Sequence, residues 1–380
     1  MASYAFVFPG QGSQSVGMGK ALADLAAWLA CHEQSVTCRP CDMPVAIART
    51  VVDAAYVECA GRRIDGLPMF DSPPTDSDGI AGTLCALDGT GDIGCLEMPP
   101  NAASIKHMRF EKIRRAATQR ALVVATRVTG ESLAPINAQY YDAPFGPPAL
   151  LIAGSHHEWL MQNAKAAAQA RFVCAHHREA TDSFNIDARI TAGNDAAPLV
   201  VVTPRTGWWE STAERAGGLV AWIASIEAAA QLKSRQRLAC DVRTYATCGH
   251  ELGHLGLSEF IRREPALMSG ARHFLHLGAN LGCASDLTLY LRAAEPEQSQ
   301  RMRELLIESG YPADHILVQS IDVVSGEGRD LTEHGATVLS MAGANAHFHA
   351  ASDRWPGNVN AAGTAAIARA VARWTEITAA

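Results

Sequence analysis

The second half of this 380-residue chain alternates short apolar strands with long helices, and this order constrains the fold more than any other feature. The helices are expected at residues 217–232, 257–264, 297–310 and 361–377. The strands are expected at residues 184–190, 198–204, 243–249, 273–280 and 336–343. Strand–helix alternation of this kind predicts a sheet with helices on both faces. We therefore predict a three-layer α/β/α fold with a mixed, mainly parallel sheet.

The segment from about residue 67 to 186 has a different pattern, in which short strands alternate with turns rich in Pro, Gly and Asp. The strands are "GTLCALD", "DIGCLEM", "ALVVATRV" and "ALLIAG", and two helices are expected near 110–120 and 157–171. We predict an α/β domain made of residues 1–71 and 186–380, with an inserted β-rich module at 72–185. The insertion is expected at loops, so that the two chain crossings lie close together.

The N-terminal region carries two local predictions. Residues 3–14 are expected to form a strand and a glycine-rich turn, with a helix from about 17 to 30, and residues 42–61 an amphipathic helix closed by Gly61. The C-x-x-C motif of Cys38 and Cys41 follows Cys31 and His32. A zinc knuckle there is an alternative to reduced, buried thiols.

Composition excludes several classes of function. The chain is 48% hydrophobic and carries a formal charge of −7, so a large core is expected and a nucleic-acid partner is not. No apolar run approaches the roughly 18 residues of a membrane-spanning helix. The N-terminus has no basic region followed by a long apolar one, so a cytoplasmic location is expected.

The stretch "CGHELGHLG" at residues 248–256 is the most informative motif, and it has three interpretations. His250, Glu251 and His254 fit the H-E-x-x-H pattern of zinc metalloproteases, which requires both histidines on one face of a helix. Here the motif follows a strand, and Gly249 and Gly253 are poor residues for a helix interior. The zinc protease therefore stays a lesser alternative.

The second interpretation is acyl transfer. "GHELG" is one letter from the "GHSLG" nucleophile motif, and "AFVFPGQGSQSVGMG" at residues 5–19 resembles the N-terminus of malonyl-CoA:acyl carrier protein transacylases. That resemblance covers about the first 28 residues only. Glu251 stands at the nucleophile position, where it cannot form the seryl ester of that family.

The third interpretation covers most of the chain. From about residue 43 the sequence resembles the di-zinc aminopeptidase and glutaminyl cyclase superfamily, and "LAPINAQYYDAPFGPPALLIAG" resembles the protease-associated module found inserted in it. The resemblance lies in the order of "VVVTPRTGWW", "STAERAGG", "TCGHELGHLG", "LHLGANLG" and "FHAASDRWP". It implies a hydrolase of amide bonds in a peptide or acyl-amino acid, with a degenerate metal site.

The resemblance also assigns positions to the metal ligands. Pro204 replaces the first histidine ligand, His250 replaces the general-base glutamate, and the fourth ligand falls near Gly278, between His276 and Asn280. The carboxylate and imidazole ligands that remain are Glu214, Glu251 and His349. Two carboxylates and one imidazole leave a fourth zinc position open for water, so the resemblance implies at most one zinc.

Roles for the remaining candidates follow from their chemistry. His250 is the expected base at neutral pH, with His254 as a second candidate. Arg205 and Arg215 are expected to bind a negative group of the substrate, and Trp208 and Trp209 to wall the pocket. The alternative is a metal-free relative that uses the same cavity to bind a small peptide-like or amino-acid-derived molecule.

Overall fold

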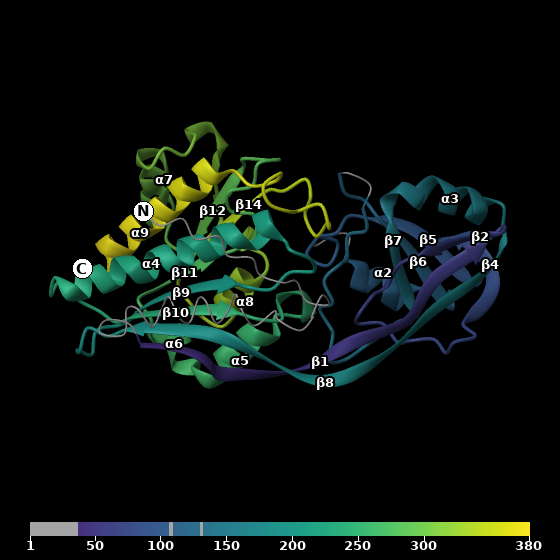
Figure 1. Ribbon diagram of the computed structural model, residues 1–380, viewed down its shortest axis with the longest axis horizontal. Helices are drawn as coiled ribbons and strands as arrows, with labels where there is room; N and C mark the ends of the chain where they lie inside the picture. Colours follow the sequence, from purple (N-terminus) through teal and green to yellow (C-terminus); the bar gives the residue numbers. More distant parts are fainter. Residues whose placement is uncertain (1–36, 106–108, 130–131) are drawn as a thin grey trace.

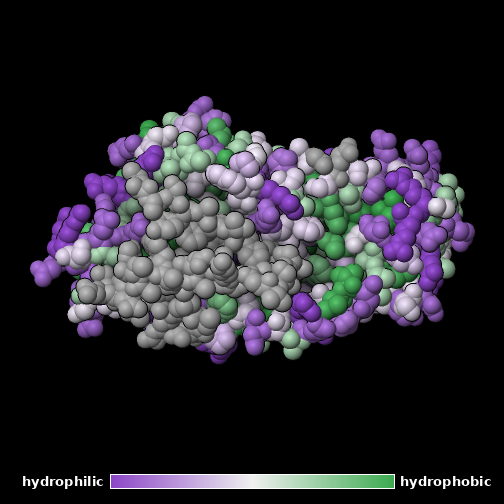
Figure 2. Space-filling model, in the orientation of Figure 1, coloured by the Kyte–Doolittle hydropathy of each residue, from purple (hydrophilic) through white to green (hydrophobic). Residues whose placement is uncertain are grey.

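The computed structural model describes residues 37–105, 109–129 and 132–380. Figure 1 shows an elongated molecule, with a larger α/β part that holds the C-terminus and a smaller β-rich part at the other end. The elements expected before residue 31, the transacylase-like segment and the Cys31 and His32 positions lie outside the described residues. No described helix is long and apolar enough to cross a membrane. In Figure 2 hydrophilic residues follow most of the outline of the molecule.

The described strands form one 14-stranded sheet that runs through both parts. The strands of the larger part are β9 (Leu199–Pro204), β10 (Val242–Thr247), β11 (His273–Leu277), β12 (Leu289–Ala293), β13 (Ile316–Ser320) and β14 (Val338–Gly343). Their order is β13-β12-β14-β11-β9-β10. β9, β10, β11 and β14 are parallel, whereas β12 is antiparallel to β14. The predicted mixed, mainly parallel sheet is confirmed.

Helices cover both faces of this sheet (Figure 1). One face packs against α4 (Gly217–Ser234), α7 (Pro296–Glu308) and α9 (Ala361–Ala379), and the other against α5 (Leu255–Arg263), α6 (Pro265–Gly270) and α8 (Glu327–Glu333). The side chains of β9 alternate between these two faces. Val201 packs in the core beneath α4, α7 and α9, whereas Val200 and Val202 pack in the core beneath α5, α6 and α8. Successive side chains of a strand point to opposite faces, so an all-apolar strand is buried twice.

The β-rich part has its own cores. Its elements are β2 (Arg62–Asp65), β3 (Leu67–Pro68), β4 (Ile80–Ala86), β5 (Ile93–Met98), α2 (Phe110–Ala116), β6 (Ala121–Thr126), β7 (Ala149–Ala153) and α3 (His157–Lys165). β4, β5, β6 and β7 are parallel neighbours in chain order. The four strands and two helices expected in this segment are all present.

Two long strands join the parts. β1 (Thr37–Cys59) and β8 (Gln169–Ile190) pair antiparallel over almost their whole length and run beneath both ends of the molecule in Figure 1. The module boundary expected at residue 186 falls inside β8, so the chain crosses there as a strand and not as a loop. The division into two domains stays a prediction.

The helix expected at residues 42–61 is wrong, because this segment is most of β1. Burial alternates from Met43 to Ile47, which is the period of a strand. The segment contains β-branched residues that favour strands, and β8 supplies the hydrogen-bonding partner along its length. The short elements β12, β13, α6 and α8 were not predicted.

Candidate active site

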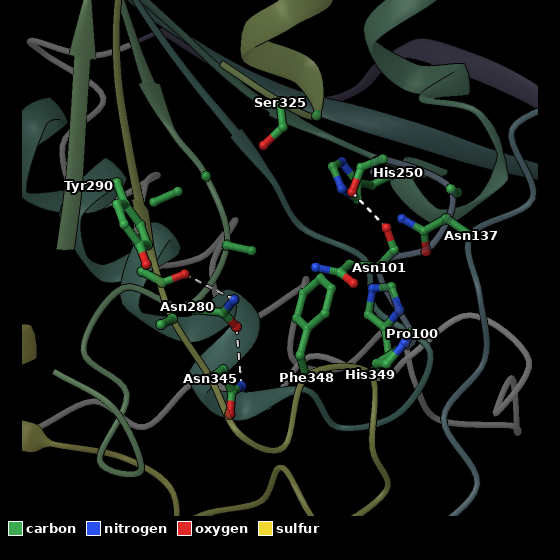
Figure 3. A pocket seen from close by; sticks show the side chains of 18 of the residues that line it. Pro100, Asn101, Asn137, His250, Asn280, Tyr290, Ser325, Asn345, Phe348 and His349 are labelled. Carbon is green, nitrogen blue, oxygen red and sulfur yellow. Dashed lines mark hydrogen bonds between the residues drawn. The ribbon is translucent and has the colours of Figure 1, made fainter. Parts of the chain in front are cut away.

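The candidate site lies where the parallel strands of the larger part end. β9 ends at Pro204, β10 at Thr247, β11 at Leu277 and β14 at Gly343, and the loops that follow carry nearly all the candidate residues. Ligands of open α/β sheets bind at this edge. A pocket of about 600 Å³ lies there, and residues such as Pro100, Asn101 and Asn137 from the β-rich part line its other side (Figure 3).

Arg215 occupies the centre of the predicted metal site. Its Nη2 lies 2.8 Å from Glu214 Oε1 and 2.8 Å from Glu251 Oε1, and all three side chains are buried. Nε of Arg215 donates to the carbonyl of Thr206, and the Thr206 hydroxyl donates to Glu251 Oε2 at 2.7 Å. The guanidinium therefore bridges two carboxylates that were expected to hold zinc. We call Arg215, Glu214 and Glu251 the arginine bridge.

The local backbone explains how this cluster forms. Glu214 and Arg215 lie in a buried π-helical turn (Thr212–Ala216) that leads into α4, and Arg215 reaches Glu251 from it. The buried carboxylate of Asp353 anchors the turn by accepting hydrogen bonds from the backbone N–H groups of Ala213 and Glu214, at 3.0 and 2.9 Å. Sequence analysis missed Asp353, although it lies four residues after His349 in the "FHAASD" segment.

Burial and charge shift the pKa values of the arginine bridge in opposite directions. Burial raises the pKa of Glu214 to about 7, and the positive charge of Arg215 only partly offsets it. Burial would also raise the pKa of Glu251, but Arg215 and His250 lower it below its usual value. Glu251 is therefore the carboxylate that stays ionised, and it forms the ion pair with Arg215.

His349 lies against Glu214. Its Nδ1 is 2.9 Å from the carbonyl oxygen of Pro135, which can only accept, so Nδ1 carries the proton and Nε2 presents a lone pair. Nε2 lies 3.5 Å from Glu214 Oε1. Neither it nor the Glu214 oxygens has a hydrogen-bond partner among the described residues. Burial lowers the pKa of His349 to about 3.

These contacts decide how well the predicted ligands fit zinc. The structure brings Glu214 and His349 together, but Glu251 is held by Arg215 and Thr206. Within the described ranges, no three His, Cys, Asp or Glu side chains are grouped so that they could hold a metal ion. The residues present do not fit the single zinc that the resemblance implied, because the positive charge of Arg215 stands between the two carboxylates.

His250 and His254 each face a carboxylate from α8. His250 Nδ1 lies 3.1 Å from Glu327 Oε1, and His254 Nδ1 lies 2.6 Å from Asp330 Oδ2. The hydroxyl of Thr247 is 2.8 Å from both Glu327 oxygens. Burial, Arg215 and His254 lower the pKa of His250 well below its usual value, so the ring is neutral. The ring can accept a proton through its lone pair, but its lowered pKa makes it a weak base at neutral pH.

Glu327 and Asp330 are site residues that sequence analysis missed. The signal for them is the i, i+3 spacing, which places both side chains on the same face of α8.

The backbone of residues 249–254 argues against the H-E-x-x-H zinc protease. His250 to Leu252 form a 3-10 turn, and Gly249, Gly253 and His254 have positive φ, so the motif is not the α-helix that a zinc protease needs.

The predicted substrate-binding residues lie around the site without lining the 600 Å³ pocket. Arg205 donates to the carbonyl of Phe184, from β8. Trp208 donates to Asn137 Oδ1 at 3.0 Å, and Trp209 donates to the carbonyl of His349 at 2.9 Å. The two tryptophans therefore tie the loop after β9 to neighbouring loops. Their roles toward a substrate, and that of Arg205, stay predictions.

Comparison with known proteins identifies the fold. No family model matches the chain, and no curated protein matches it. Among solved structures it is similar to a peptidase M28 precursor from Shewanella amazonensis, with a TM-score of 0.69, 15% identity, and coverage of 98% of this chain and 89% of the other. It is also similar to the zinc aminopeptidase BSAP from Bacillus subtilis, with a TM-score of 0.68, 15% identity, and coverage of 97% and 90%.

An aminopeptidase from Aneurinibacillus sp. strain AM-1 gives a TM-score of 0.67 at 12% identity, covering 98% of this chain and 90% of the other. The chain thus shares its fold with these peptidases over nearly its whole length, and the resemblance predicted from the sequence is confirmed for the fold. The likeness of residues 72–185 to a protease-associated module, and of residues 5–19 to transacylases, stays a prediction.

Proposed function

We propose that this chain is a metal-free relative of the zinc aminopeptidases, and that its pocket binds a small peptide-like or amino-acid-derived molecule. The arginine bridge carries this proposal, because Arg215 Nη2 lies 2.8 Å from both Glu214 and Glu251. Two unit charges of the same sign about 4 Å apart repel by about 4 kcal/mol at an effective dielectric constant near 20. A divalent zinc beside Arg215 is therefore strongly disfavoured, while Arg215 already provides the positive charge for both carboxylates and a hydrogen bond to Glu251.

A second candidate is amide hydrolysis with at most one zinc on Glu214, Glu251 and His349, and His250 as the base. One observation favours it: the Glu214 carboxyl and His349 Nε2 face each other at 3.5 Å without hydrogen-bond partners in the described chain. A proton or a cation between them would satisfy both groups. Zinc with all three ligands requires Arg215 to release Glu251.

Metal content and turnover separate the two candidates. The protein is purified without chelator, equilibrated with zinc, dialysed and measured by mass spectrometry, and it is assayed against aminoacyl amides and N-acyl-amino-acid amides. We expect neither stoichiometric zinc nor hydrolysis. One equivalent of zinc together with amide hydrolysis, both lost in Glu251→Gln and both kept in the exposed control Glu304→Gln, would overturn the proposal in favour of the hydrolase.

A further inference from the structure

Among the residues that the structure describes, the ionisable side chains that line the 600 Å³ pocket are all basic or neutral. This described lining includes four histidines, which are His250, His254, His276 and His349, and three arginines, but no aspartate or glutamate. Acidic residues outnumber Lys and Arg in the whole chain, 39 to 32, so an acid-free lining is not a consequence of composition. A pocket with this lining favours a negatively charged occupant.

Of these three arginines, Arg292 alone has no ion pair with a carboxylate in the part of the chain that the structure describes. Arg329 pairs with Asp330 at 3.2 Å, and Arg127 lies 3.5 Å from Glu97. No ion pair joins Arg292 to a carboxylate of residues 37–105, 109–129 or 132–380. Its Nε donates to Gln319 Oε1 at 3.0 Å, and its guanidinium lies 5.0 Å from the centre of the Tyr290 ring. Burial lowers the pKa of Arg292, as expected for a cation that lacks a partner.

The register of the sheet places Arg292 beside a second polar group. His276 of β11 is opposite Ser340 of β14, and Ser340 is opposite Arg292 of β12. Residues directly opposite each other on neighbouring strands share a face, so His276, Ser340 and Arg292 form a polar row across the sheet. His276 Nδ1 lies 2.9 Å from Ser340 Oγ, whereas the buried His276 Nε2 has no hydrogen-bond partner among the described residues.

Neutral side chains continue the site on the same side. Figure 3 shows Tyr290, Asn280 and Asn345 grouped along one side of the pocket. Asn345 Nδ2 donates to Asn280 Oδ1 at 3.1 Å, which orients both amides. The pocket volume of about 600 Å³ is in the range of small-molecule sites, which are about 300–1,000 Å³. The cavity is large enough for an amino-acid derivative.

We propose that this pocket binds a small organic acid through its carboxylate, with the guanidinium of Arg292 as the anchor. Arginine offers two parallel N–H groups that match a carboxylate. Nε of Arg292 is used by Gln319, and no hydrogen bond joins either Nη group to another described residue. The inference deepens the proposed function by naming the class of ligand. It does not depend on Arg205 or Arg215, on which the sequence-based prediction of an acidic substrate rested, since neither lines this pocket.

A paired panel tests the ligand class. The N-acetyl derivatives of the twenty amino acids and their twenty carboxamides are titrated calorimetrically into the chelator-treated protein, with inorganic phosphate as a further arm. At least one acid should bind, and its amide should bind at least tenfold more weakly. The two compounds differ only in that the amide replaces the negative carboxylate with a neutral carboxamide. Equal binding of acid and amide, no binding by any acid, or tighter binding of phosphate than of every acid would each refute the inference.

Two variants at position 292 test the anchor. Arg292→Gln should weaken the acid at least tenfold and leave the weak binding of the amide unchanged, and Arg292→Lys should recover part of the loss. Arg301→Gln, an exposed arginine on α7, is the matched control and should bind as the wild type does. If Arg292→Gln remains folded by circular dichroism and binds the acid normally, the anchor is wrong. Binding that appears only after zinc is added would refute the proposed function instead.

Discussion

Replacing Arg215 by methionine should cost the protein much of its stability at neutral pH. The substitution keeps an unbranched side chain but removes a buried cation from between Glu214 and Glu251, whose side chains are fully buried. Removing one partner of a buried ion pair typically costs about 3–5 kcal/mol. An independent route leads to a similar value, since protonating a glutamate of ordinary pKa, about 4.3, at pH 7 costs about 3–4 kcal/mol.

Urea denaturation at two pH values measures this loss. At pH 5 the carboxyl groups protonate at a smaller cost, so the difference between Arg215→Met and the wild type should shrink. A triple variant that adds Glu214→Gln and Glu251→Gln should regain most of the stability, because no buried charge is then left unpaired. Arg301→Met, at an exposed position, is the control and should change little.

Zinc provides an independent readout of the same argument. With the guanidinium gone, Glu214, Glu251 and His349 are available as ligands, and zinc at about 100 times its dissociation constant would stabilise the variant by about 2.7 kcal/mol. Neither the wild type nor the triple variant should respond. The reasoning is refuted if Arg215→Met loses less than about 1 kcal/mol at pH 7, or if zinc stabilises the wild type as strongly as the variant.

Two further predictions concern the framework of the site. His276 is buried with its pKa lowered to about 4, so its contribution to stability is present above its unfolded pKa of about 6.5 and is lost as the pH falls toward 4. In the wild type the free energy of unfolding should therefore fall between about pH 6.5 and 4, and His276→Gln should remove up to about 3 kcal/mol of that fall. Urea denaturation across this pH range measures it, and the same pH dependence in wild type and variant would contradict it. At Gly217, which follows the π-helical turn, an added Cβ would lie 1.5 Å from the carbonyl oxygen of Leu281. Gly217→Ala should therefore lower the melting temperature sharply, while Gly270→Ala, where a Cβ meets nothing within 4 Å, should not; equal effects would show that the close approach at Gly217 relaxes easily.

Sequence patterns were sufficient to predict those elements whose signal lies within a short stretch of chain. Val200, Val201 and Val202 belong to an uninterrupted apolar run, which predicts a strand buried on both faces, and the structure places it at the centre of the sheet. The loops after such strands were correctly expected to carry Glu214, Glu251 and His349. The segment 42–61 was assigned wrongly because its apolar residues fit both a helix and a strand. Only the pairing with β8 selects the strand.

The sequence by itself determined the α/β class, the order of the strands' terminal motifs and hence the resemblance to the aminopeptidases. Only the tertiary structure decided what the site contains. Arg215 meets Glu251 across 36 residues of chain, and His250 meets Glu327 across 77. Arg292 and His276 come to lie on either side of Ser340 through the register of β12, β14 and β11. Strand and helix periodicity is set by contacts within a few residues, but the partner of a buried charge is whichever group the fold brings within about 3 Å, and this distance is fixed by packing.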